Sequence, residues 1–156
     1  PEFLGPGPKP EILAPLLGLP PGDIGTGRHV PSRHGVGPSF TCVPVASVAA
    51  LDAARPAQAP DPADGLYLYT PDPEGTGQSW RVRMFAPNFG VPEDPATGAA
   101  ASAFAGVLMQ FETLGEGTHD VAIRARDRRW AGRARSRSRS PSRRVPCGAS
   151  RSAARP

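Results

Sequence analysis

Hydrophobic and polar residues alternate in two segments near the middle of the chain. Residues 66–70 read LYLYT, and residues 80–85 read WRVRMF, with Trp80, Val82 and Met84 on one face. Alternation with a period of two is typical of a β-strand that buries one face. The connecting residues, PDPEGTGQS, are turn formers, so the simplest prediction is a β-hairpin.

Four further segments have the pattern of a strand or a helix. Residues 39–45 (SFTCVPV) and 119–123 (HDVAI) favour strands. A helix is predicted over 47–54, where Ser47 can cap the first N–H groups. Another short helix is predicted over 11–19 (EILAPLLGL), which ends at a glycine followed by two prolines.

Glycine and proline set where irregular structure is expected. The 156 residues include 18 glycines and 21 prolines, well above average usage. Residues 1–10 are predicted to be an irregular connector, residues 22–38 loops and residues 55–64 a linker. An alanine-rich helix is predicted over 95–111. The sequence contains no internal repeat.

Charge is divided unevenly along the chain. Residues 1–120 hold 6 basic and 13 acidic side chains, whereas residues 121–156 hold 12 arginines and one aspartate. The net charge of +4 therefore describes an acidic body with a basic tail. Residues 133–144 (RARSRSRSPSRR) are typical of a disordered Arg/Ser repeat that binds RNA or is phosphorylated. An RNA-binding or phospho-regulated protein is therefore an alternative function.

The cysteines and the lengths of the apolar segments indicate the cellular compartment in which the protein is expected. Cys42 and Cys147 are too far apart in sequence for a metal-ligand pattern, and two cysteines do not make a disulfide scaffold. Two reduced thiols, with Cys42 buried, are expected. Residues 1–7 lack the features of a signal peptide, and no apolar run approaches the ~18 residues of a membrane span. A cytoplasmic protein without a membrane partner is expected.

The segment 93–99 (EDPATGA) carries the candidate chemistry. Asp94 suits the N-cap of the helix predicted over 95–111, and Pro95 suits its first position. The free amides that follow, together with the helix dipole, make an anion site. These amides belong to Thr97, Gly98 and Ala99. A carboxylate beside such a site can transfer protons to a bound acid, although on these residues alone a simple helix cap is the favoured interpretation.

Two strings in the chain resemble a known family. Residues 83–100 (RMFAPNFGVPEDPATGAA) resemble the signature of the PhzF-like proteins, and residues 35–51 (GVGPSFTCVPVASVAAL) are similar to the start of that family's second half. The resemblance covers roughly residues 10–124. It implies an α+β protein with the diaminopimelate epimerase fold, in which each of two halves is a mixed sheet rolled around a central helix.

The resemblance implies how the chain is divided. Residues 35–124 are expected to form one incomplete half of the fold, with the central helix over 95–111. Residues 1–34 are expected to be a connector and a remnant of the first half. Residues 125–156 are expected to be a disordered tail.

The resemblance also implies an activity. It indicates a cofactor-independent isomerase or epimerase, similar to one in phenazine biosynthesis, that binds no metal and acts on a small carboxylic acid. Related epimerases carry a catalytic cysteine at the helix start, where PhzF-like proteins have the aspartate that matches Asp94. Asp94 is therefore implied to be catalytic, with the amides of Thr97, Gly98 and Ala99 as the substrate-binding groups. Homodimers are common in the family.

The chain departs from the family in two ways. Ala99 stands where the family often has serine, so a hydroxyl contact is lost. The first half, with its catalytic glutamate and Gly-His pair, is missing, and neither Glu2 nor Glu11 matches that glutamate. Surface or structural roles are expected for His29, His34 and His119. The chain alone is therefore expected to be an inactive fragment.

The sequence of the tail can also be explained by a shift of the reading frame. PhzF-like proteins usually follow the strand at 119–123 with Gln-Gly-x-Glu-Met-Gly-Arg-Pro-Ser. Codons compatible with residues 125–134 encode this motif in order when read from the third base of each codon. We hypothesise that residues from about 125 onward are a frameshifted translation of a GC-rich gene. Nucleic acid is expected as a partner only if the tail is genuine.

Overall fold

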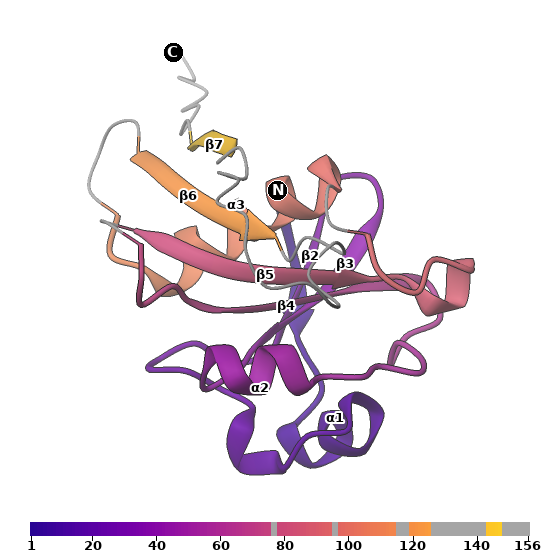
Figure 1. Cartoon of the computed structure of the whole chain (residues 1–156). Helices are drawn as coiled ribbons and strands as arrows, with labels where there is room; N and C mark the ends of the chain where they lie inside the picture. Colours follow the sequence, from indigo (N-terminus) through magenta and orange to yellow (C-terminus); the bar gives the residue numbers. More distant parts are fainter. Residues whose placement is uncertain (76–77, 95–96, 115–118, 126–142, 148–156) are drawn as a thin grey trace, which may run out of the picture.

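The fold is built on one mixed β-sheet. A computed structural model describes residues 1–75, 78–94, 97–114 and 119–125, together with the backbone of 143–147. Within these residues, seven strands form a single sheet whose spatial order follows their order along the chain, from β1 to β7. Helices lie on both faces of this sheet (Figure 1).

The centre of the sheet contains three strands that the sequence predicts. These are β3 (Ser39–Pro44), β4 (Asp64–Pro71) and β5 (Ser79–Phe85). Strands β4 and β5 pair in the antiparallel direction, with Leu66 opposite Phe85, which confirms the hairpin. Strand β3 runs parallel to β4, so the chain must cross over between them, and the helix predicted over 47–54 occupies this crossover.

One edge of the sheet is formed by two strands where irregular structure was expected. Strand β1 (Glu2–Pro6) pairs with β2 (Ser32–Gly35), and β2 pairs with β3, both in the antiparallel direction. The predictions of a connector over 1–10 and of loops over 22–38 are therefore wrong at these strands. Backbone pairing with the neighbouring strands of the sheet stabilises them, although their own composition does not favour strands.

The other edge extends into the expected tail. Strand β6 (His119–Ala125) runs parallel to β5, and the backbone of β7 (Arg143–Cys147) pairs with β6 in the antiparallel direction. The expectation of a tail without regular structure is thus wrong at β7, because backbone hydrogen bonding to β6 extends the sheet. The remainder of the tail, including the Arg/Ser repeat up to residue 142, lies outside the described residues.

The helices connect the strands. They are α1 (Pro10–Leu17), α2 (Val48–Ala53), α3 (Gly98–Phe111) and the short 3₁₀ helices η1 (Pro21–Asp23) and η2 (Pro87–Phe89). The predicted cap of α2 is confirmed, because the Ser47 hydroxyl accepts a hydrogen bond from the Ala50 amide at 3.1 Å. Helix α1 ends at Gly18, whose φ of 66° lies in the left-handed region that favours glycine.

The two faces of the sheet bury separate hydrophobic clusters. Leu66 and Leu68 of β4 pack with α1 and α2, whereas Tyr67 and Tyr69 pack with α3. The side chains of β5 predicted to share one face, Trp80, Val82 and Met84, all lie on the α3 side. Figure 1 shows α1 and α2 below the sheet and α3 on its opposite face.

Helix α3 lies at the centre of a curved sheet. It contacts β1, β2 and β3 at one edge and the backbone of β7 at the other, so the sheet curls around it. Helix α3 lies close to β2 at Gly106, where an added Cβ atom would lie 2.8 Å from His34 Nδ1. The expected α+β architecture, a mixed sheet rolled around a central helix, is confirmed.

The end of α3 is tied to the loop before β2 by a buried histidine. His29 is 4% exposed; its Nε2 lies 2.8 Å from Glu112 Oε1 and its Nδ1 3.2 Å from the Tyr69 hydroxyl. Arg28 also donates to Glu112. His34 is buried as well. Of the two roles expected for these histidines, a surface position is therefore excluded for His29 and His34.

The stability of the fold is expected to fall in two steps as the pH is lowered. Burial lowers the pKa of His34 below its ordinary value of 6.5, so the unfolded chain takes up this proton more readily, and stability falls below about pH 6.5. Burial opposes ionisation of Glu112, but hydrogen bonds from His29 and Arg28 outweigh it and lower its pKa below the ordinary 4.5. The stabilisation from this carboxylate is lost as the pH falls below about 4.5 and through its folded-state pKa.

Urea unfolding between pH 8 and pH 3 measures both steps. The variant Glu112→Gln is expected to reduce the lower step and leave the upper step in place, and the remainder of the lower step comes from carboxylates such as Asp64, whose pKa the fold also lowers. A midpoint that does not change between pH 7 and pH 5.5 in the unmodified chain would contradict the assignment of the upper step to His34.

Candidate functional site

The segment after β5 turns back along the end of that strand. The amide of Ala86 donates to the Val91 carbonyl at 2.9 Å, and the amide of Val91 donates back to the Ala86 carbonyl at 3.1 Å. Gly90, with a φ of 73°, closes the turn between them. The amide of Asp94 then donates to the Met84 carbonyl at 2.9 Å. The backbone of Asp94 is therefore held against the sheet just before α3.

The carboxylate of Asp94 is bonded to the residue that precedes α3. The Thr97 hydroxyl donates a hydrogen bond to Asp94 Oδ2. Helix α3 begins at Gly98, and Thr97 occupies its N-cap position. The prediction of a helix from 95 with Asp94 as its N-cap is therefore wrong by three residues. The reason is that Asp94 is paired with β5 and keeps the chain out of the helix, while residues 95–96 lie outside the described residues.

The start of α3 presents backbone donors next to this carboxylate. Gly98 and Ala99 are the first two residues of the helix, and the first N–H groups of any helix have no carbonyl partner within it. The Gly98 residue is exposed, and Thr97 and Ala99 are partly exposed. The helix dipole adds a partial positive charge at this end. The structure therefore brings Asp94, Thr97, Gly98 and Ala99 together at one helix start.

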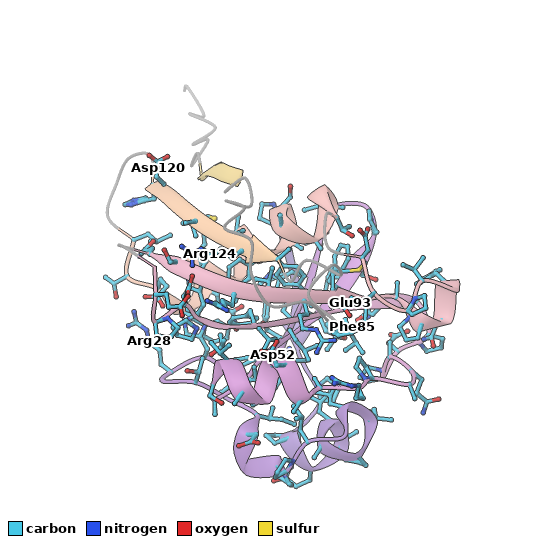
Figure 2. All side chains as sticks on the ribbon, viewed as in Figure 1. Arg28, Asp52, Phe85, Glu93, Asp120 and Arg124 are labelled. Carbon is cyan, nitrogen blue, oxygen red and sulfur yellow. The ribbon has the colours of Figure 1, made fainter. Side chains whose placement is uncertain are left out.

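A buried arginine beneath the site was missed by the sequence analysis as a functional candidate. Arg83 is 4% exposed, and its Nε and Nη2 donate to the two carboxylate oxygens of Glu93 at 2.9 and 3.0 Å. The sequence offered one signal, which is that both residues fall in the string 83–100. Figure 2 labels Glu93, Phe85 and Asp52, which surround this guanidinium.

Other chemistries find little support among the described residues. Cys42 is buried as expected, and burial raises the pKa of its thiol far above the ordinary range. The described part of the chain contains no cluster of three metal-ligating side chains. It also contains no helix that is both long and apolar enough to span a membrane.

A mixed sheet wrapped around a central helix, with the Asp94 carboxylate at the helix start, is the architecture that the chain shares with the solved structures on which it superposes. The chain belongs to the phenazine biosynthesis-like family, PhzC-PhzF, which matches residues 22–133. This match includes the whole segment from Arg83 to Ala99 and extends beyond residue 125.

Two curated relatives are named as isomerases. The chain is 31% identical over 124 residues to an uncharacterized isomerase of Mesorhizobium japonicum, covering 73% of this chain and 41% of that protein. It is 42% identical over 74 residues to the trans-2,3-dihydro-3-hydroxyanthranilate isomerase of Pseudomonas aeruginosa, covering 44% of this chain and 24% of that protein. The chain thus spans less than half the length of either relative.

Solved structures show the same fold. A PhzF-family phenazine biosynthesis protein of Bacillus anthracis superposes with a TM-score of 0.67 at 19% identity, covering 78% of this chain and 44% of that chain. A predicted epimerase of Pseudomonas aeruginosa gives a TM-score of 0.56 at 26% identity, covering 78% and 43%. In both comparisons the chain matches less than half of a longer protein.

Proposed function

We propose that the chain supplies one half of a cofactor-independent isomerase that moves a proton on a small carboxylic acid. The observation that carries this proposal is the Asp94 carboxylate beside the first amides of α3. A proton-transferring group must lie next to the place where the substrate is held, and a helix start binds carboxylates. The segment therefore combines both requirements.

Each residue of the site has a distinct role in this proposal. Asp94 takes up or delivers the proton at the substrate. The amides of Thr97, Gly98 and Ala99 bind the substrate carboxylate and hold it near Asp94. The Thr97 hydroxyl orients Asp94 through its hydrogen bond.

The complete catalytic apparatus requires groups beyond this chain. The family resemblance places a glutamate and a Gly-His pair opposite Asp94, and these belong to the half that the chain does not match. The proposed substrate class follows the dihydro-hydroxyanthranilate in the name of the Pseudomonas relative. We further propose a homodimer located in the cytoplasm. The RNA-binding alternative depends on residues 124–144, most of which lie outside the described residues.

Removing one helix amide is expected to weaken carboxylate binding. The variant Ala99→Pro deletes the amide of residue 99, and proline is tolerated in the first turn of a helix. A lost hydrogen bond to a charged group weakens affinity by about tenfold or more. Titration of the chain with benzoate, followed through the NMR signal of the Gly98 amide, measures this change.

The matched control is Ala99→Ser, which keeps the amide and restores the hydroxyl that the family often has. This variant is expected to bind benzoate at least as tightly as the original chain. Equal affinities for the original chain and Ala99→Pro would show that the helix start is not the carboxylate site.

A further inference from the structure

We propose that Arg83 and Glu93 are a positioning pair that sets the direction in which the Asp94 carboxylate points. This proposal rests on the proposed function, because that function gives Asp94 its catalytic role. The contacts between Arg83 and Glu93 themselves involve no substrate. The proposal concerns residues on the opposite face of the sheet from α3.

The guanidinium of Arg83 is bound on three sides. It forms two parallel hydrogen bonds with the Glu93 carboxylate, at 2.9 and 3.0 Å. Its Nη1 donates to the carbonyls of Leu51 at 2.7 Å and Ala54 at 3.0 Å. The centroid of the Phe85 ring lies 4.6 Å from the central carbon of the guanidinium. A planar guanidinium held in this way cannot rotate without losing several hydrogen bonds.

Carbonyl groups at the end of α2 hold the Arg83 side chain in place. Leu51 lies in the last turn of α2, and Ala54 is its C-cap residue. Carbonyls at a helix C-terminus lack partners within the helix and favour a nearby cation. Arg83 therefore bridges α2 and the Glu93 side chain, and it anchors the loop that follows β5.

Glu93 and Asp94 direct their carboxylates to different partners. Glu93 is bound by Arg83, which shares the face of β5 that carries Phe85 and packs toward α2. Asp94 is bound by Thr97 at the start of α3, the helix that packs on the other face. The Asp94 amide is bonded to Met84, the neighbour of Arg83 on β5. Fixing Glu93 on one face therefore holds Asp94 toward the other.

The test uses the isotope-labelled 156-residue chain and NMR. The variant Asp94→Asn identifies the carboxyl ¹³C signal of Asp94, because that signal is lost in it. The variant Thr97→Val removes the hydroxyl and gives the chemical shift of the Asp94 carboxyl carbon without that hydrogen bond. In Arg83→Lys, which keeps the charge but not the two-point contact, this signal is expected to move toward the Thr97→Val value. In the same variant, the amide hydrogen of Asp94 is expected to exchange with solvent about tenfold faster relative to that of Tyr67, because one hydrogen bond is weakened.

A second variant tests the same contact from its other side, and a matched control tests an arginine outside it. Glu93→Gln is expected to give the same two changes and decides the question if Arg83→Lys does not fold. Arg81→Lys, on the same face of β5 but paired with Asp72 and Glu74, is expected to change neither signal. The proposal is overturned if the Asp94 signals stay unchanged, or if Tyr67 exchange accelerates equally. Neither readout uses substrate, so this outcome is separate from failure of the proposed function.

Discussion

Replacing Asp94 by asparagine is expected to lower the turnover rate by about 10²–10⁴-fold in an enzyme of full family length that contains this chain, because general acid–base groups contribute on this scale. Asparagine has the same shape and can still accept the hydrogen bond from Thr97. It cannot take up or release a proton at neutral pH. The variant therefore separates proton transfer from the architecture of the site.

Incorporation of solvent deuterium into the product measures the proton transfer directly. Benzoate affinity is expected to stay within a few-fold of the original, because the amides of Gly98 and Ala99 are unchanged. The matched control is Asp120→Asn on β6, since Figure 2 shows Asp120 at the upper left, well separated from Glu93. Equal turnover in the Asp94 and Asp120 variants would remove Asp94 from the catalytic apparatus.

Replacing Phe104 by alanine is expected to reduce the free energy of unfolding by about 3–5 kcal/mol. Phe104 is fully buried on α3. Its ring centroid lies 4.8 Å from that of Tyr69, 5.5 Å from that of Tyr67 and 5.6 Å from that of Trp80. The substitution leaves a cavity between the helix and the sheet and removes three aromatic contacts. Urea unfolding at pH 7.5 measures the loss.

The control for this prediction is Phe89→Ala in η2, whose side chain is 61% exposed. An exposed residue of the same type is expected to change stability by less than about 0.5 kcal/mol. A loss below about 1 kcal/mol for Phe104→Ala would mean that α3 is not the packing centre of the sheet.

The sequence predicts the middle of the sheet well and its edges poorly. In β4 and β5, the large apolar and aromatic residues are a local signal, because they fall at positions that a strand buries on its own. In β2, the residues SRHG carry no such pattern. That strand forms because β3 offers hydrogen-bonding groups, which is a property of the folded sheet rather than of the segment.

The candidate site shows the same limit on a smaller scale. The position of Asp94 near the start of a helix could be predicted, since the residue types suit a helix N-terminus. The start of α3 at Gly98 could not, because it depends on the hydrogen bond from the Asp94 amide to Met84. The role of Arg83 was hidden for a related reason. Its partners at the end of α2 lie about thirty residues away in the chain.

The order of the strands has a consequence for how the protein is made. Because β1 to β7 lie in the sheet in the same order as in the chain, each strand pairs with the one synthesised just before it. Among the strands that the structure describes, none has to insert between two that have already paired. The sheet can therefore grow from one edge as the chain leaves the ribosome, with domains folding from the N-terminal side. Helix α3 emerges only after β5, so the aromatic face of β4 and β5 stays uncovered until then.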